Sequence, residues 1–299
     1  MYTGQRRKDA MKVLLLGATG MAGCAITKQL HHRGFHSTGV ARSGSDISCE
    51  LTDERRVIEL LRNSNYDAVI NAAAQVDIDQ CDMDPIESWR INARLVSILA
   101  NLSQDIGFPI LQISTDHYYI HGGNCSHKEA DPVYLVNEYA RHKYAAEHFA
   151  LANSNSLVLR TSLLGVRGAG AKSLIEWAVD SLGKKESINL FNDAWTSSID
   201  VPTFVDIALN LFFDVGYRGL VNVGSREVFS KENLIRKLAD LLNLDHSNCE
   251  SRSVDMLSNR ANCLGLDVSK CEKLLAQKMP SMEEVCLSLI QNYPLIGRT

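Results

Sequence analysis

The sequence predicts an α/β fold, in which a doubly wound parallel sheet is followed by a smaller C-terminal α/β lobe. Short apolar runs alternate with segments of helical spacing over the first 160 residues, a pattern typical of a parallel sheet with helices on both faces. A glycine-rich turn joins the first strand to the first helix. The alternation becomes irregular after residue 160, which indicates a second, smaller unit.

The elements of the sheet follow one another in order. We expect strands at residues 12–16, 36–41, 67–71, 109–114 and 156–160, and helices at residues 21–33, 53–63, 84–106 and 135–152. The long helix begins near Pro85, since proline is favoured in a first helical turn. Farther along we expect a loop and helix within 168–183, strands at 187–191 and 219–223, and helices at 202–213, 231–242, 268–275 and 281–291. Ser230 and Asn233 form a predicted capping box for the helix from residue 231.

Composition excludes several classes of protein. The 299 residues are 45% hydrophobic and carry a net charge of −4, with acids and bases interspersed, so we expect no nucleic-acid surface. No apolar run reaches the length of a membrane span. Residues 1–10 are polar and are expected to be a flexible extension without a secretory signal.

Cysteine and histidine spacing gives no metal motif. The eight cysteines are scattered, which predicts reduced thiols in a cytoplasmic protein. His117, His121 and His127 cluster mildly, and we interpret them as part of a polar loop rather than a zinc site. We expect no metal.

The turn after the first strand has the pattern of a Rossmann-type dinucleotide site. Gly17, Gly20 and Gly23 would permit a tight turn, close approach of the backbone to a pyrophosphate, and close packing of helix on strand. The helix N-terminus would offer free N–H groups to the phosphates. The predicted cofactor contacts in this turn are Gly17, Thr19, Gly20 and Gly23. The alternative is a merely glycine-rich turn.

The residues after the second strand predict the form of the cofactor. NAD-specific sites carry an acid there to bind the ribose 2′-hydroxyl, whereas this chain has Arg42 and Ser43. A guanidinium pairs well with a 2′-phosphate, so we expect NADP(H). A solvated loop arginine is the alternative.

Tyr139 and Lys143 are four residues apart, which places both on one face of the predicted helix 135–152. An ammonium beside a phenol lowers the tyrosine pKa from its ordinary value of about 10, so Tyr139 could exchange a proton with a substrate oxygen. Thr115 follows the strand 109–114, at the sheet edge where ligands of such folds bind. The three residues are therefore candidate catalytic residues, with coincidence as the alternative.

These motifs, in this order, resemble the extended short-chain dehydrogenase/reductases, and most closely the dTDP-4-dehydrorhamnose reductase family. The similarity rests on the glycine loop, Asn71 to Ala74, Ser114 to Asp116, Tyr139 with Lys143, and Arg160 to Ser162. The resemblance implies a catalytic set of Thr115, Tyr139 and Lys143. It implies cofactor contacts from Gly20, Met21, Ala22, Arg42, Glu50, Leu51, Ala72, Ala73 and Ala74, with Tyr139 and Lys143 beside them. It further implies an NADP-binding domain at residues 11–160 and a mainly substrate-binding lobe at 161–299, with the chain crossing between them.

The implied activity is NADPH-dependent reduction of the 4-keto group of a nucleotide-linked deoxysugar. Leu163 and His117 depart from the family's usual residues, which leaves the sugar open. Other sugar-nucleotide enzymes of the superfamily, epimerases among them, stay as alternatives, although Arg42 disfavours an epimerase and His117 a dehydratase. A non-catalytic NADP-binding regulatory subunit is a further alternative. A nucleotide sugar is the expected partner, and a homodimer is left open.

Overall fold

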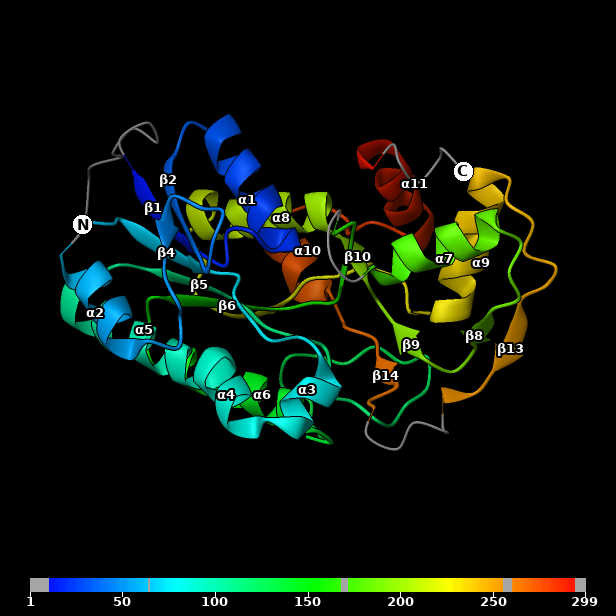
Figure 1. The fold of residues 1–299 in the computed structure, drawn as a ribbon, viewed down its shortest axis with the longest axis horizontal. Helices are drawn as coiled ribbons and strands as arrows, with labels where there is room; N and C mark the ends of the chain where they lie inside the picture. The colour runs from blue at the N-terminus through cyan, green and yellow to red at the C-terminus, as the bar shows by residue number, and fades with distance from the viewer. Residues whose placement is uncertain (1–10, 64, 168–171, 255–259, 294–299) are drawn as a thin grey trace. The chain divides into compact units, whose positions relative to one another are not determined.

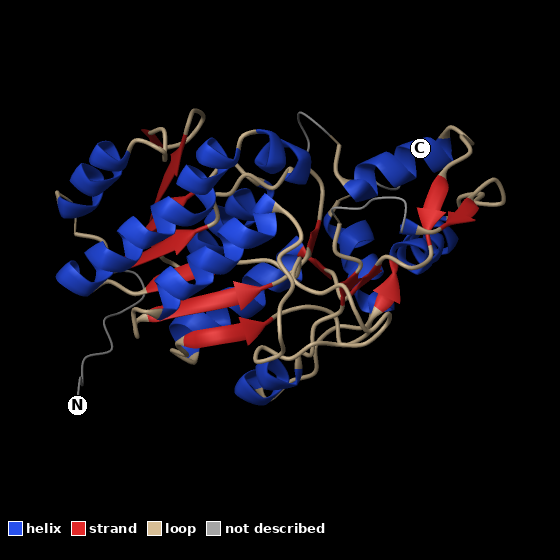
Figure 2. Cartoon of the chain, turned by 90° about the horizontal axis from the view of Figure 1, so that it is seen from below, coloured by secondary structure: helices blue, strands red, loops and turns tan. Residues whose placement is uncertain are grey.

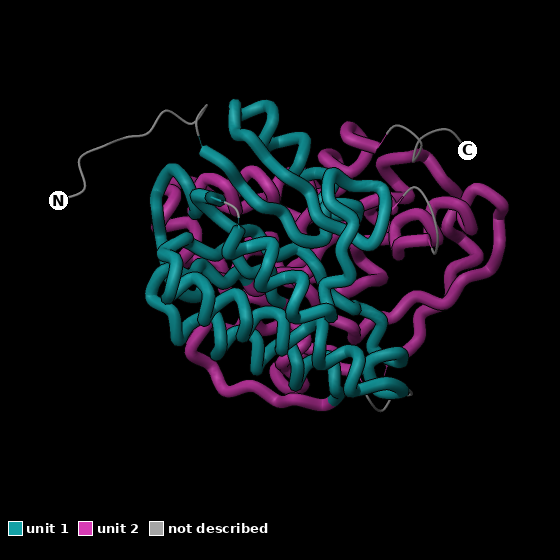
Figure 3. Tube along the Cα trace, turned by 60° about the vertical axis from the view of Figure 1, so that its left-hand side comes forward, with its two compact units in different colours: residues 1–114, 137–159, 212–220 teal, residues 115–136, 160–211, 221–299 magenta. Residues whose placement is uncertain are grey.

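The computed structural model describes residues 11–63, 65–167, 172–254 and 260–293. The chain divides into two compact units, drawn in different colours in Figure 3. Unit 1 comprises residues 1–114, 137–159 and 212–220, and unit 2 comprises residues 115–136, 160–211 and 221–299. The expectation for residues 1–10 lies outside the described residues.

A seven-stranded sheet organises unit 1, in the order β11-β6-β5-β4-β1-β2-β3. Its strands are β1 (Lys12–Leu16), β2 (His36–Ala41), β3 (Ile47–Ser48), β4 (Ala68–Asn71), β5 (Ile110–Ile113), β6 (Ser156–Arg160) and β11 (Gly219–Asn222). The pairs from β3 to β6 are parallel, and Val13 lies opposite both Ser37 and Ala68. The prediction of a doubly wound parallel sheet is confirmed.

The helices of unit 1 cover both faces of this sheet. They are α1 (Met21–His32), α2 (Glu54–Arg62), α3 (Ile78–Met83), α4 (Pro85–Trp89), the π-helical turn η2 (Arg90–Arg94), α5 (Leu95–Ile106) and α6 (Glu138–Leu151). Figure 1 shows α1 on one face, with α2, α5 and α6 on the other. A core of fully buried side chains such as Leu14, Val69 and Leu99 joins the sheet to α2 and α5.

Local signals in the sequence explain where these helices begin and end. Asp53 caps α2 by accepting the Arg56 amide, and Asn137 caps α6 by accepting the Ala140 amide. Gly107 ends α5 with a positive φ of 98°, a conformation that favours glycine. The helix predicted at 84–106 is present, although η2 interrupts its regular hydrogen bonding.

Unit 2 is built from short strands and five longer helical segments. Its strands are β7 (Leu163–Leu164), β8 (Asn189–Phe191), β9 (Trp195–Thr196), β10 (Ile199–Asp200), β12 (Phe229–Ser230), β13 (Glu250–Arg252) and β14 (Cys263–Leu264). Each has two or three residues, and strands are drawn in red in Figure 2. Its helices are α7 (Leu174–Gly183), α8 (Val201–Leu209), α9 (Lys231–Leu242), α10 (Ser269–Leu275) and α11 (Met282–Asn292), and the π-helical turn η3 (Asn210–Asp214) follows α8. The predicted capping box of Ser230 with Asn233 is confirmed at the start of α9.

The cysteines and apolar segments carry two further observations. All eight cysteines are free thiols, and Cys24 and Cys125 are the exposed ones. Within the described part of the chain, no helix combines the length and the apolar character needed to cross a membrane.

Candidate functional site

The turn after β1 and the first turn of α1 are packed too closely for side chains at Gly17 and Gly23. Gly17 has a φ of 80°, and a Cβ on it would lie 2.7 Å from the backbone nitrogen of Ala73. A Cβ on Gly23 would lie 2.1 Å from the carbonyl oxygen of Gly17. The amides of Gly17 and Ala18 both donate to the carbonyl of Val40, which ties the turn to β2. The glycines therefore bring β1, β4 and the start of α1 together, as the dinucleotide pattern requires.

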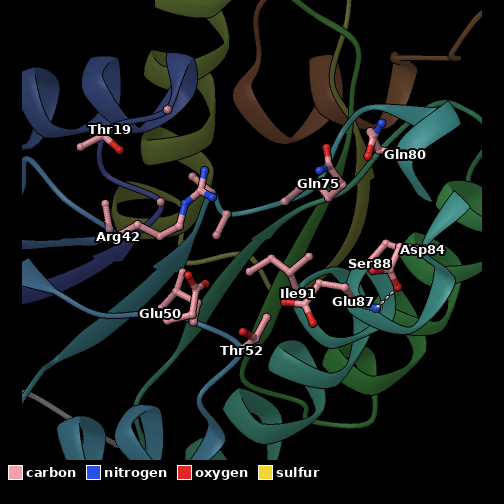
Figure 4. Close-up of a pocket in the computed structure, with 17 residues that line it drawn as sticks. Thr19, Arg42, Glu50, Thr52, Gln75, Gln80, Asp84, Glu87, Ser88 and Ile91 are labelled. Atoms are coloured by element: carbon pink, nitrogen blue, oxygen red, sulfur yellow. Dashed lines mark hydrogen bonds between the residues drawn. The ribbon is translucent and has the colours of Figure 1, made fainter. Parts of the chain in front are cut away.

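A cavity of about 370 Å³ lies beyond this turn, within unit 1 (Figure 4). Gly17, Thr19, Gly20, Arg42, Glu50, Leu51, Ala72, Ala73 and Ala74 line it, so these predicted cofactor residues lie together. Met21, Ala22, Gly23, Tyr139 and Lys143 are not among the lining residues. The cavity sits at the carboxyl ends of β1, β2 and β4, where open α/β sheets bind ligands.

Eight of the seventeen lining residues were not among the predicted cofactor contacts. These are Ala41, Thr52, Gln75, Gln80, Asp84, Glu87, Ser88 and Ile91. Gln75 is held by Asn92, whose side chain accepts the Gln75 amide and donates to its carbonyl, each at 2.9 Å. These two hydrogen bonds fix the segment after β4 against η2, and no local sequence signal predicts them.

The residues around the cavity have the chemistry that a nicotinamide dinucleotide requires. The close approach of Gly17 and Ala73 leaves backbone rather than side chains around the turn, as a pyrophosphate needs. Arg42 is exposed at the end of β2, where a 2′-phosphate could be paired. Figure 4 shows Arg42 and Glu50 on the side of the cavity near β2, with Gln75 and Ser88 on the opposite side.

Tyr139 and Lys143 lie one turn apart on α6 and are both buried. Tyr139 packs against Ile78 and Cys81 of α3. The Lys143 ammonium donates to the carbonyl of Ile113, at the end of β5, over 2.7 Å. Burial lowers the pKa of Lys143 to about 8, and the negative charge of Glu147 acts in the opposite direction. The helix therefore carries a phenol and, one turn later, an ammonium whose pKa is lowered.

Thr115 lies in unit 2 and is buried. Its hydroxyl accepts the His117 amide at 3.3 Å. Burial raises the pKa of the neighbouring Asp116 carboxyl to about 7. Burial, followed by the positive charges of Lys231 and Arg260, lowers the pKa of His117 to about 3. The imidazole at this position is therefore neutral over the physiological range and is a weak base.

Two of the three histidines singled out in the sequence pack against aromatic rings. His127 stacks on Tyr119 with centroids 4.0 Å apart, and His121 meets Tyr134 edge-on at 5.0 Å. Across the residues that the structure describes, no group of three or more histidine, cysteine or acidic side chains could hold a metal ion.

This chain is similar to known proteins over most of its length. The model of the family described as "RmlD substrate binding domain" matches residues 11–293. The chain is 27% identical over 287 residues to the "Probable low-salt glycan biosynthesis reductase Agl14" of Haloferax volcanii, covering 92% of this chain and 95% of that protein. It is 26% identical over 287 residues to methionine adenosyltransferase 2 subunit beta of Pongo abelii, covering 90% and 84%.

The fold of this chain is also similar to that of a solved structure. The crystal structure of a "hypothetical dTDP-4-dehydrorhamnose reductase" from Sulfolobus tokodaii superposes with a TM-score of 0.81 at 25% identity, covering 91% of this chain and 97% of that chain. The resemblance drawn from the sequence motifs is confirmed.

Proposed function

Because the chain belongs to the RmlD substrate binding domain family, we propose that it reduces the 4-keto group of a nucleotide-linked deoxysugar with NADPH. The bound cofactor would supply the hydride for the carbonyl carbon. The turn of Gly17, Thr19 and Gly20 would hold its pyrophosphate, and Arg42 its 2′-phosphate. Leu51 and Ala72 to Ala74 would line the remainder of its path.

The proton for the carbonyl oxygen would come from the Tyr139 hydroxyl. The Lys143 ammonium stabilises the phenolate that forms, because an adjacent positive charge favours the ionised phenol. The hydroxyl of Thr115 would donate a hydrogen bond to the same substrate oxygen. One hydride and one proton are thereby added across the C=O bond, and the product is an alcohol.

The buried Lys143 ammonium is the observation that carries this proposal. Burying an ammonium is costly unless polar groups compensate it, and the Ile113 carbonyl accepts a hydrogen bond from Lys143 here. This hydrogen bond holds the ammonium of a residue that lies one turn from Tyr139 on α6. Strongly perturbed groups of this kind gather at functional sites. Dehydration is disfavoured because His117, where a dehydratase carries a glutamate, has a pKa of about 3 and is a poor base near neutrality.

The proposal is tested by presenting a panel of nucleotide-linked 4-ketosugars to the protein with NADPH. We expect loss of the reduced-nicotinamide absorbance with at least one of them, and one alcohol product for each cofactor oxidised. The unmodified nucleotide sugars, which have no ketone, are the control. Failure with every ketosugar, while NADPH still binds tightly, would refute the reductase.

A second candidate rests on the similarity to methionine adenosyltransferase 2 subunit beta, which extends over 90% of the chain. In that reading the same pocket binds NADP(H) and the chain acts as a non-catalytic, regulatory subunit. The two candidates differ in whether Tyr139 matters for turnover.

Arg42→Ala is expected to weaken NADPH binding by roughly 10- to 100-fold while NADH binding changes little. The reason is that a guanidinium–phosphate contact contributes about 1.5–3 kcal/mol, and only NADPH has the 2′-phosphate. Titration calorimetry with both cofactors measures the two dissociation constants. Arg56→Ala, in the exposed part of α2, is the matched control. Equal losses for both cofactors would mean that Arg42 does not read the 2′-phosphate.

A further inference from the structure

Glu147 is a buried carboxylate close to the candidate catalytic residues that the proposed mechanism does not use. It lies on α6, one turn after Lys143 and two turns after Tyr139, and only 1% of its surface is exposed. Residues four apart on a helix are neighbours on one face. A carboxylate that is removed from water is costly unless charges or hydrogen bonds compensate it, so its position calls for an explanation.

The end of β5 holds both side chains. Lys143 donates to the carbonyl of Ile113 at 2.7 Å, and the hydroxyl of the next residue, Ser114, donates to the Glu147 carboxylate at 2.6 Å. Ile113 and Ser114, which are consecutive in the chain, thus hold the Lys143 ammonium and the Glu147 carboxylate at the same end of β5.

Most of the other charged groups around α6 form ion pairs that do not involve Lys143. The elements packed against this helix carry Asp79 and Asp82 on α3, Glu87 on α4, Arg90 and Arg94 on η2, and Asp105 on α5, while α6 itself carries Glu138, Arg141, His142 and His148. Arg90 pairs with Glu87, Arg94 with Glu54, Asp105 with Arg62, and Arg141 and His142 with Glu138. Glu147 is the group whose charge opposes the loss of the Lys143 proton.

We propose that Glu147 is a positioning residue, which keeps the Lys143 ammonium charged and fixed beside Tyr139. Its effect on the reaction rests on the proposed function of Lys143, whereas its pairing with Lys143 does not. Glu147 touches neither cofactor nor substrate in this scheme, and it acts through the lysine alone.

The pairing is tested without substrate. Protein labelled with ¹³C at the lysine ε-carbons is titrated by NMR, and the Lys143 signal is assigned by its absence from Lys143→Met. In Glu147→Gln, which keeps the shape and an oxygen acceptor for Ser114, we expect the Lys143 midpoint to fall by about one pH unit. Glu147→Asp should restore part of this loss, and Glu138→Gln, on the same helix, should leave the midpoint in place. An unchanged midpoint in Glu147→Gln would overturn the proposal.

The effect on the reaction is read from the pH profile of turnover. Reduction needs the ammonium, so activity should fall as pH rises through the Lys143 midpoint. At the wild-type midpoint, a fall of one pH unit leaves about a tenth of the molecules charged instead of half, so turnover drops about fivefold. The basic limb of the Glu147→Gln profile should therefore move toward acid.

Two results separate this proposal from the proposed function. A shifted NMR midpoint with an unshifted turnover profile would leave the pairing intact and refute the use of the Lys143 charge in catalysis. If Glu147→Gln fails to fold, Ser114→Ala keeps the charge but removes the anchor from β5. The proposal then predicts greater motion of the Lys143 side chain, which NMR relaxation of its labelled ε-carbon measures. Relaxation equal to that of the wild type would overturn the proposal.

Discussion

Tyr139→Phe is expected to lower turnover by roughly 10²–10⁴-fold while the dissociation constant for NADPH changes little. Phenylalanine keeps the ring that packs against Ile78 and Cys81, so the fold around α3 and α6 should persist. It removes the hydroxyl proton that the ketone oxygen would receive. Steady-state turnover on an identified ketosugar and NADPH titration by calorimetry give the two quantities.

The matched control is Tyr144→Phe, the same change on the same helix. Tyr144 contacts His148 edge-on and has no part in the proposed chemistry, so its turnover should stay within a few-fold of wild type. Wild-type turnover in Tyr139→Phe would exclude the tyrosine as proton donor. A protein that binds NADPH tightly and reduces no ketosugar, with or without Tyr139, would instead match the regulatory-subunit alternative.

Lys143 gives a second contrast with Tyr139. Lys143 is expected beside the cofactor contacts and is proposed to assist the phenol, so loss of its charge should harm both cofactor binding and turnover. Loss of the Tyr139 hydroxyl should harm turnover alone. This difference follows from the placement of the two side chains one turn apart on α6, with Lys143 tied to the end of β5.

The central sheet could be predicted from the sequence because its strands are buried on both faces. Such strands read as continuous apolar runs, and β1, at Lys12–Leu16, has the predicted bounds. Short elements have no comparable signal. The helix α3 has only six residues, of which three are polar, and β9 and β14 pair Trp195 with Cys263 across a long sequence separation.

The candidate site was predictable only where local chemistry marks it. The glycines and Arg42 are recognisable because the turn and the phosphate each require particular residue types. Gln75, in the segment after β4, and Ser88, on α4, line the same cavity because tertiary packing brings α4 to the end of β4. The contact of Glu147 with Ser114 joins residues 33 positions apart, and no periodicity in either segment predicts it.

Gly23→Ala is expected to lower the free energy of unfolding by about 3 kcal/mol, near the upper end of the usual cost of overpacking. The new Cβ would lie 2.1 Å from the Gly17 carbonyl oxygen and 2.9 Å from backbone atoms of Ala18. These are backbone atoms of a turn whose amides are bonded to the Val40 carbonyl, so they cannot give way as a flexible side chain would. Alanine gains about 1 kcal/mol over glycine within a helix, which is too little to offset this clash.

Gly20→Ala is the matched control, at the residue that precedes α1 and three positions before Gly23. A Cβ there would meet only the Gly17 carbonyl oxygen, at 3.3 Å, and a shift of a few tenths of an ångström would relieve the contact. Gly20 lines the cavity, however, and its new methyl group would face the proposed pyrophosphate. Denaturant unfolding followed by circular dichroism should therefore show a large loss for Gly23→Ala and a small one for Gly20→Ala, while calorimetry should show weakened NADPH binding for Gly20→Ala. Equal stability of the two variants would mean that the close packing of α1 on the turn does not contribute to the fold.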